Sequence, residues 1–147
     1  MIKTGQPEFK FYEQTGISTC KLIYKNKTFI GKAKCHKDDQ DMKSEKVGCE
    51  IAYYRAIIEA LKYERDSIIK PSLKALRQLY YSMNRSKRFN SKSYENKMLW
   101  SQIYNWQLDL DAVNLLLATT REMLRNYIET KENLYKSVRM NRNRGQN

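Results

Sequence analysis

The sequence predicts an α+β fold: a small N-terminal antiparallel β-sheet, with a hairpin over residues 19–35, followed by three or four α-helices. The first observation is the alternation of apolar and polar residues in short runs before residue 35, which is typical of strands with one buried face. The second is that the chain from Cys49 to Arg144 contains no glycine and a single proline, Pro71. Because glycine and proline most often interrupt regular structure, this composition predicts long helices.

Three alternating segments predict the strands. They are Glu8 to Tyr12, Thr19 to Tyr24 and Thr28 to Cys35. The polar segment Lys25-Asn26-Lys27, between the second and the third, is typical of a hairpin turn. Gly31 indicates either a β-bulge or a place where another backbone comes close to the sheet.

The same alternation predicts which side chains share a face, because successive side chains of a strand point to opposite sides. One face of the hairpin collects the apolar and small residues, namely Cys20, Leu22, Tyr24, Phe29, Gly31, Ala33 and Cys35. Lys21, Lys32 and Lys34 then point the other way, toward solvent or an anion.

Helix signals begin at Ser44, a suitable N-cap, and at Glu45, whose charge suits the start of a helix. Apolar residues at steps of three and four define a buried face, made of Val47, Ile51, Tyr54, Ile58, Leu61 and Ile68. Ala52, Ala56 and Ala60 form a narrow stripe that lets a sheet or another helix come close. Pro71 is expected to end this helix and to open the next.

The second helix is expected to run to about Met83, and the basic, polar segment 84–92 is the clearest break in the helical region. A third helix starts at Ser93 or Tyr94, and Asp109 or Asp111 either caps a separate helix or lies inside one long helix. We expect a single domain with strands and a loop over residues 1–43, helices over residues 44–140, and a basic flexible tail over residues 141–147.

The charge balance favours an anionic partner. The chain has 28 Lys and Arg residues against 16 Asp and Glu, a formal net charge of +12. Such a balance suits a nucleotide, a nucleic acid, an acidic protein or an anionic membrane surface, although it also fits a basic surface with no such partner. The sequence shows no secretory signal and no apolar stretch long enough to span a membrane. The three cysteines lack a CxxC pattern and are expected to be reduced, which indicates a cytoplasmic protein.

Two positions combine a cation or an amide with an aromatic ring. Arg55 follows Tyr53-Tyr54, so it suits either stacking on a base and binding a phosphate, or pairing with Glu59 four residues on. Phe89 and Asn90 lie among lysines and arginines, an arrangement that suits contact with a nucleotide or a solvated connection between helices. These residues are candidate ligand-binding residues.

Arg121 and Arg125 are the remaining candidate ligand-binding residues. Their spacing puts them on one helix face, where they can hold a phosphate together or pair with Glu122 and Glu129.

A polar segment near the single histidine invites a metal or catalytic interpretation, and it contains His36, Asp38, Asp39 and Asp41. It lacks the glycine and the final glutamate of a calcium loop, so we interpret it as a turn leading into a helix. With one histidine and no recognised pair of nucleophile and base, we expect no enzymatic activity, no catalytic or metal-binding residues and no cofactor.

The apolar face from Val113 to Val138, with Trp100 and Trp106, is large for so small a chain. It either covers the sheet or forms an interface between copies, and we expect a homo-oligomer.

Two resemblances bear on function. The segment KLIYKNKTFIGKAK followed by IAYYRAIIEAL is similar in outline to the second half of a double-stranded-RNA-binding domain. The lysine-rich loop of that module is replaced here by HKDDQDMKSEK, whose aspartates repel a phosphate backbone.

The layout of the whole chain resembles the phage anti-Thoeris sponge family, small proteins that sequester cyclic ADP-ribose signals made by bacterial immune enzymes. The features that carry this resemblance are the small sheet, the loop GKAKCHKDDQD, the helix GCEIAYYRAIIEAL with Arg55, and later helices with Phe89 and the pair Arg121 and Arg125. The resemblance implies that Arg55, Phe89 and Asn90 stack on and hydrogen-bond the signal. It also implies that Arg121 and Arg125 belong to a second pocket for cyclic oligonucleotides, and that the protein is a dimer or a trimer of dimers.

We therefore expect a phage protein that sequesters a small cyclic nucleotide without catalysis, in the host cytoplasm. The alternatives are a nucleic-acid-binding or anti-nuclease protein that uses its basic surface, and an interaction protein whose helices bind an acidic partner.

Overall fold

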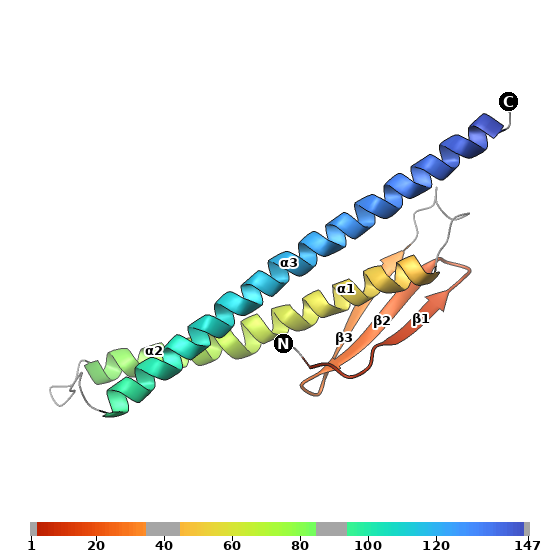
Figure 1. Ribbon diagram of the computed structural model, residues 1–147. Coiled ribbons are helices and arrows are strands. Elements are labelled where there is room, and N and C mark those ends of the chain that lie inside the picture. The colour runs from red at the N-terminus through yellow and green to blue at the C-terminus, as the bar shows by residue number, and fades with distance from the viewer. Residues whose placement is uncertain (1–2, 35–44, 85–93, 146–147) are drawn as a thin grey trace. The chain divides into compact units, whose positions relative to one another are not determined.

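The computed structural model describes residues 3–34, 45–84 and 94–145 and has the predicted α+β fold (Figure 1). Three strands come first in the chain and helices follow. The chain forms two compact units: unit 1 comprises residues 1–60 and 118–147, and unit 2 comprises residues 61–117.

The sheet of unit 1 contains β1 (Glu8–Tyr12), β2 (Ile17–Tyr24) and β3 (Lys27–Lys34), in the order β1-β2-β3 with antiparallel neighbours. The predicted hairpin is confirmed, but its turn is shorter than expected because Lys27 already belongs to β3. Lys25 and Asn26 have φ angles of 49° and 62°, as a two-residue type I′ turn requires. The turn fixes the pairing of Cys20 with Gly31.

The core of unit 1 lies between the sheet and helix α1 (Glu45–Tyr63), and it consists of Cys20, Leu22, Ala33, Ala52 and Ala56. The alanine stripe predicted from the sequence is fully buried. A Cβ atom built on Gly31 would lie 1.9 Å from the carbonyl oxygen of Ala52 and 2.6 Å from the amide nitrogen of Ala56. Of the two interpretations of Gly31, close backbone approach is therefore the one that holds.

Pro71 lies in the first turn of a helix, as expected, but it does not interrupt the helical chain. After α1 the chain continues through a π-helical segment, η2 (Glu64–Ile69), into α2 (Lys70–Asn84), and Pro71 is the second residue of α2. The amide of Lys70 donates to the carbonyl of Arg65, five residues earlier. A proline ring normally clashes with the carbonyl four residues before it, and a wider π turn next to the proline gives that contact more room. Ser72 Oγ donates to the carbonyl of Ile68 (2.6 Å) and satisfies an acceptor in the same region.

The last helix, α3 (Tyr94–Gly145), is a single helix of 52 residues. Asp109 and Asp111 therefore lie inside one long helix, which was one of the two alternatives, and no separate helix begins at either residue. The flexible tail expected from residue 141 is helical as far as Gly145.

The core of unit 2 joins α2 to the first half of α3 through the buried residues Leu73, Leu99 and Ile103. Partly buried side chains surround them, namely Leu76, Tyr80, Met83, Trp106 and Leu110. At the surface Arg77 donates to Gln107 (2.7 Å), which in turn donates to Asp111 (3.1 Å). These polar contacts fix the register of α3 on α2.

None of the helices, as far as the structure describes them, is long and apolar enough to cross a membrane.

Candidate functional site

Arg55 is anchored to the edge of the sheet. Its Nη1 donates a hydrogen bond of 2.6 Å to the carbonyl oxygen of Lys32, on the edge strand β3. The arginine lies on α1 one residue before Ala56, whose backbone touches Gly31. The close approach of α1 to β3 therefore brings the guanidinium to this edge. Neither alternative considered from the sequence, base stacking or pairing with Glu59, included this contact.

The tyrosines next to Arg55 pack with other aromatic rings of unit 1. Ring centroids are 6.3 Å apart for Phe9 and Tyr53, 6.4 Å for Tyr53 and Tyr54, and 6.2 Å for Tyr54 and Tyr127. These tilted geometries are the favourable ones for aromatic pairs. The row of rings joins β1, α1 and the second half of α3, so it holds the helix that carries Arg55.

Tyr127 lies at one end of this row. Burial, together with the charge and the hydrogen bond of Glu50, raises the pKa of the Tyr127 hydroxyl to about 12. Lys131 Nζ lies 5.4 Å from the centre of the Tyr127 ring, within the range of a cation–π contact. The phenol therefore keeps its proton to a higher pH than an ordinary tyrosine, and it acts as a packing group with a polar end.

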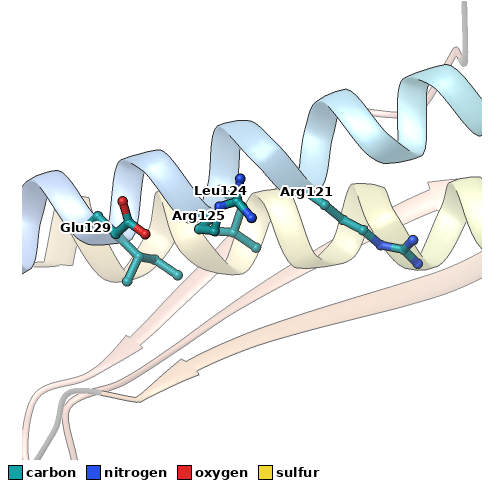
Figure 2. Close-up of a pocket in the computed structure, with 5 residues that line it drawn as sticks. Arg121, Leu124, Arg125 and Glu129 are labelled. Atoms are coloured by element: carbon teal, nitrogen blue, oxygen red, sulfur yellow. The ribbon is translucent and has the colours of Figure 1, made fainter.

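Arg121 and Arg125 line one shallow hollow on α3 with Leu124, Ile128 and Glu129. In Figure 2 the Arg121 side chain extends along the helix away from Arg125, so the two guanidinium groups lie apart. Arg125 donates to the Glu122 carboxylate, and this bond is the main reason that the pKa of Arg125 is raised. The ion pair considered as the alternative to phosphate binding is therefore present for Arg125. The structure places both arginines at one hollow, but it does not bring their donors together.

Phe89 and Asn90 lie outside the described residues, and so do His36, Asp38, Asp39 and Asp41. Within residues 3–34, 45–84 and 94–145, no group of three or more His, Cys, Asp and Glu side chains is placed to hold a metal ion.

The thiols of Cys20 and Cys49 are free and are not activated. Burial and the neighbouring Cys49 raise the pKa of Cys20 to about 11. Burial, and then the charge of Glu45, also raises the pKa of Cys49. A nucleophilic cysteine needs a lowered pKa, so the raised values argue against that role for both thiols. Cys20 has no exposed surface and is a small core residue, whereas Cys49 is half-buried.

The face of the sheet opposite α1 carries a group of cations that the sequence indicated only in part. Lys21, Lys32 and Lys34 lie on this face as predicted, and the register adds Lys10 of β1, which is level with Thr19 and Lys32. Lys10 was recognisable from the alternation of EFKFY, in which it separates Phe9 from Phe11. Its position beside the other lysines depends on how β1 pairs with β2, and the sequence of neither strand alone determines that pairing.

Comparisons with protein-family models, with curated proteins and with solved structures found no match to this chain.

Proposed function

We propose that the protein binds and sequesters a small phosphate-bearing cyclic nucleotide without changing it. The ligand is of the cyclic ADP-ribose type that the resemblance to anti-Thoeris sponges implies, and capture of it would inhibit an anti-phage defence. The proposal includes a phage origin and action in the host cytoplasm. The observation that carries it is the anchoring of Arg55 on the carbonyl of Lys32, at the edge of a basic strand.

The anchoring matters because of the shape of the arginine side chain. A guanidinium has five N–H donors in a rigid planar fork, and a single bond to a backbone carbonyl leaves donors for a phosphate or a ribose. The bond also reduces the rotational freedom that ligand binding would otherwise have to restrict. A hydrogen bond to a charged group contributes about 1.5–3 kcal/mol, so this arginine is a strong candidate for recognising an anion.

The test is isothermal titration with cyclic ADP-ribose isomers, combined with native mass spectrometry of protein purified from cells that make these signals. Wild-type protein should retain one nucleotide of unchanged mass per site, released only by denaturation. Arg55→Ala should bind at least tenfold more weakly, the equivalent of about 1.4 kcal/mol. Arg55→Lys should fall between the two, because it keeps the charge but loses the fork.

Arg65→Ala is the matched control, since Arg65 lies on η2, ten residues after Arg55, and bonds to Asp66 (2.8 Å) on the same segment. Its affinity should equal that of the wild type. If Arg55→Ala binds as well as Arg65→Ala, Arg55 is not part of the site. If no isomer binds to any variant and no nucleotide copurifies, sequestration of such a signal is wrong.

The proposal also includes self-association through unit 2. On its part of α3 the large exposed apolar side chains are Tyr94, Met98, Trp100, Tyr104, Leu108, Leu115 and Leu116. Tyr94 is 75% and Leu115 68% exposed, which is unusual for side chains of this size in a helix with no further partner.

The charges on this part of α3 favour a second copy in antiparallel orientation. Lys97 and Asp111 are exposed and lie seven residues before and after Tyr104. When two copies of the helix meet antiparallel at Tyr104, Lys97 of each lies beside Asp111 of the other. A parallel pair would set like charges against each other, which is unfavourable. The expected building block is thus a twofold dimer, alone or in a trimer of dimers.

Analytical ultracentrifugation of charge variants tests this arrangement. Lys97→Glu and Asp111→Lys should each shift the protein toward monomer, and the double variant Lys97→Glu, Asp111→Lys should restore the dimer. Failure of the double variant to associate better than either single variant would contradict the antiparallel pairing.

A further inference from the structure

The open face of the sheet, on the side away from α1, is a surface that the proposed function does not use. The register places its side chains in three rows, each running across β1, β2 and β3. The middle row is Lys10, Thr19 and Lys32. The rows on either side of it are Glu8, Lys21 and Ile30, and Tyr12, Ile17 and Lys34. All of these residues are exposed or half-buried. Helix α1 covers the opposite face and packs closely on it at Gly31 and Ala52. Only the open face is therefore accessible to a ligand.

The open face carries an excess of positive charge at defined spacings. The three rows contain four lysines and a single acidic residue, Glu8. Neighbouring strands lie about 4.8 Å apart, so the Cα atoms of Lys10 and Lys32 are roughly 10 Å apart with the Thr19 hydroxyl between them. Lys32 and Lys34 are about 6.7 Å apart along their strand. Such a lattice of ammonium groups suits a chain of phosphates better than a single one.

Apolar and aromatic groups lie between these cations. Tyr12 is 51% exposed and Ile30 54% exposed, and both line a hollow of about 580 Å³ on this face together with Lys10, Ile17 and Lys32. A lysine-rich surface that binds only phosphates does not need exposed rings or isoleucines. A base that stacks on the Tyr12 ring would cover that ring and Ile17, which is level with it on β2. Bases are available for such stacking in single strands but not in a duplex.

We propose that the open face of the sheet binds a single strand of nucleic acid, with Lys10, Lys21 and Lys32 on its phosphates and Tyr12 on a base. This activity is independent of the nucleotide capture proposed for Arg55. The charge complementarity between the lysine rows and a phosphate backbone carries the proposal.

The experiment measures fluorescence anisotropy of a labelled 20-nucleotide oligo(dT) as wild-type protein is added, at salt concentrations from 50 to 200 mM. Affinity should fall steeply with salt, because each phosphate contact with a single strand contributes about 0.7 to the slope of log K against log salt. Lys10→Gln, Lys21→Gln should reduce this slope by about 1.4 and weaken binding at least tenfold at low salt. Tyr12→Ala should weaken binding at least fivefold with little change of slope, since stacking is not ionic.

The matched control is Lys74→Gln, Lys136→Gln, which removes the same charge from exposed positions of α2 and α3. If this variant loses as much affinity as Lys10→Gln, Lys21→Gln, binding follows net charge and the site is wrong. Absence of binding at 50 mM salt, or tighter binding of a duplex than of the single strand, would also overturn the proposal. Circular dichroism melts of each variant exclude loss of the fold as the cause.

Different variants should separate cyclic-nucleotide capture from binding of a single nucleic-acid strand. Lys10 and Lys21 lie on β1 and β2, and Arg55 contacts β3, so Lys10→Gln, Lys21→Gln should leave the affinity for cyclic ADP-ribose isomers unchanged. Conversely, oligo(dT) binding by a protein that captures no cyclic nucleotide would support the sheet site alone.

Discussion

Replacing Gly31 by alanine tests the contact on which unit 1 is built. The added Cβ would lie 1.9 Å from the carbonyl oxygen of Ala52 and 2.6 Å from the amide nitrogen of Ala56. Both neighbours are backbone atoms in the middle of α1, so neither can move aside by a side-chain rotation. The helix as a whole must retreat from the sheet by more than 1 Å to reach an ordinary contact distance of about 3.5 Å.

The expected destabilisation follows from this geometry. Overpacking by one methyl group typically costs about 1–3 kcal/mol, and immovable backbone neighbours put Gly31→Ala at the upper end, near 3 kcal/mol. A loss of this size lowers the Tm of a domain in this size range by roughly 10 °C. The retreat of α1 also lengthens the bond from Arg55 to Lys32, which is 2.6 Å in the wild type. Gly31→Ala should therefore weaken capture of a cyclic nucleotide at temperatures where the protein is still folded.

Urea unfolding followed by far-UV circular dichroism measures the change in stability, and hydrogen exchange of the β2 and β3 amides locates it. Gly5→Ala is the matched control, because its Cβ would meet only the carbonyl oxygen of Ile23, at 3.9 Å. The reasoning is refuted if Gly31→Ala unfolds within 0.5 kcal/mol of Gly5→Ala. Tryptophan fluorescence is the wrong probe here, because Trp100 and Trp106 both belong to unit 2.

Two further predictions use the shifted pKa values of unit 1. Cys20 has a pKa of about 11 and no exposed surface, so iodoacetamide at pH 8.5 should not label it in the folded protein and should label it fully in urea. Peptide mass spectrometry measures the labelling. Labelling of Cys20 in the folded protein would contradict its place in the core. Tyr127 has a pKa raised from 10.0 to about 12, so the folded form resists deprotonation and its contribution to stability is complete below pH 10 and lost as the pH rises to about 12. The late part of the tyrosine titration, followed by absorbance at 295 nm, should move to lower pH in Glu50→Gln. An unchanged titration would mean that Glu50 does not act on Tyr127.

The sheet and its contact with α1 could be predicted from the sequence because both depend on local patterns. Alternation identified the strands of the hairpin, and alanines at every fourth position identified the face of α1 that approaches the sheet. Gly31 left two possibilities open, since a bulge and a close approach need the same residue. The atoms that exclude a side chain at Gly31 belong to a helix more than 20 residues away in the chain, and no local pattern contains that information.

The helices were harder to predict where tertiary packing overrides local signals. Proline usually interrupts a helix, yet the chain stays helical through the π-helical segment η2 into α2, which contains Pro71. The sequence pattern allows Asp109 or Asp111 to cap a helix, but Asp111 accepts a hydrogen bond from Gln107, which in turn accepts one from Arg77 of α2. In both places the deciding contacts are specific to this fold.

In the candidate site, too, helical spacing was predictable from the sequence, whereas contacts that depend on tertiary packing were not. Arg121 and Arg125 were correctly placed on one helical surface by their spacing, but spacing does not determine where flexible guanidinium groups point, and Arg125 bonds to Glu122. The anchoring of Arg55 on Lys32 joins residues 23 positions apart and follows only once α1 is packed on the sheet.

The two-residue turn at Lys25 and Asn26 determines more than the end of a hairpin. Because side chains alternate with a period of two, a slip of one residue would move Lys32 and Lys34 from the open face of the sheet to the face under α1. Such a slip would also replace Gly31 with a residue that has a side chain, at the point where α1 leaves no room for a Cβ atom. The turn and the glycine therefore specify the same register independently. That register holds the apolar core on one face, the lysines on the other, and Arg55 at the edge between them.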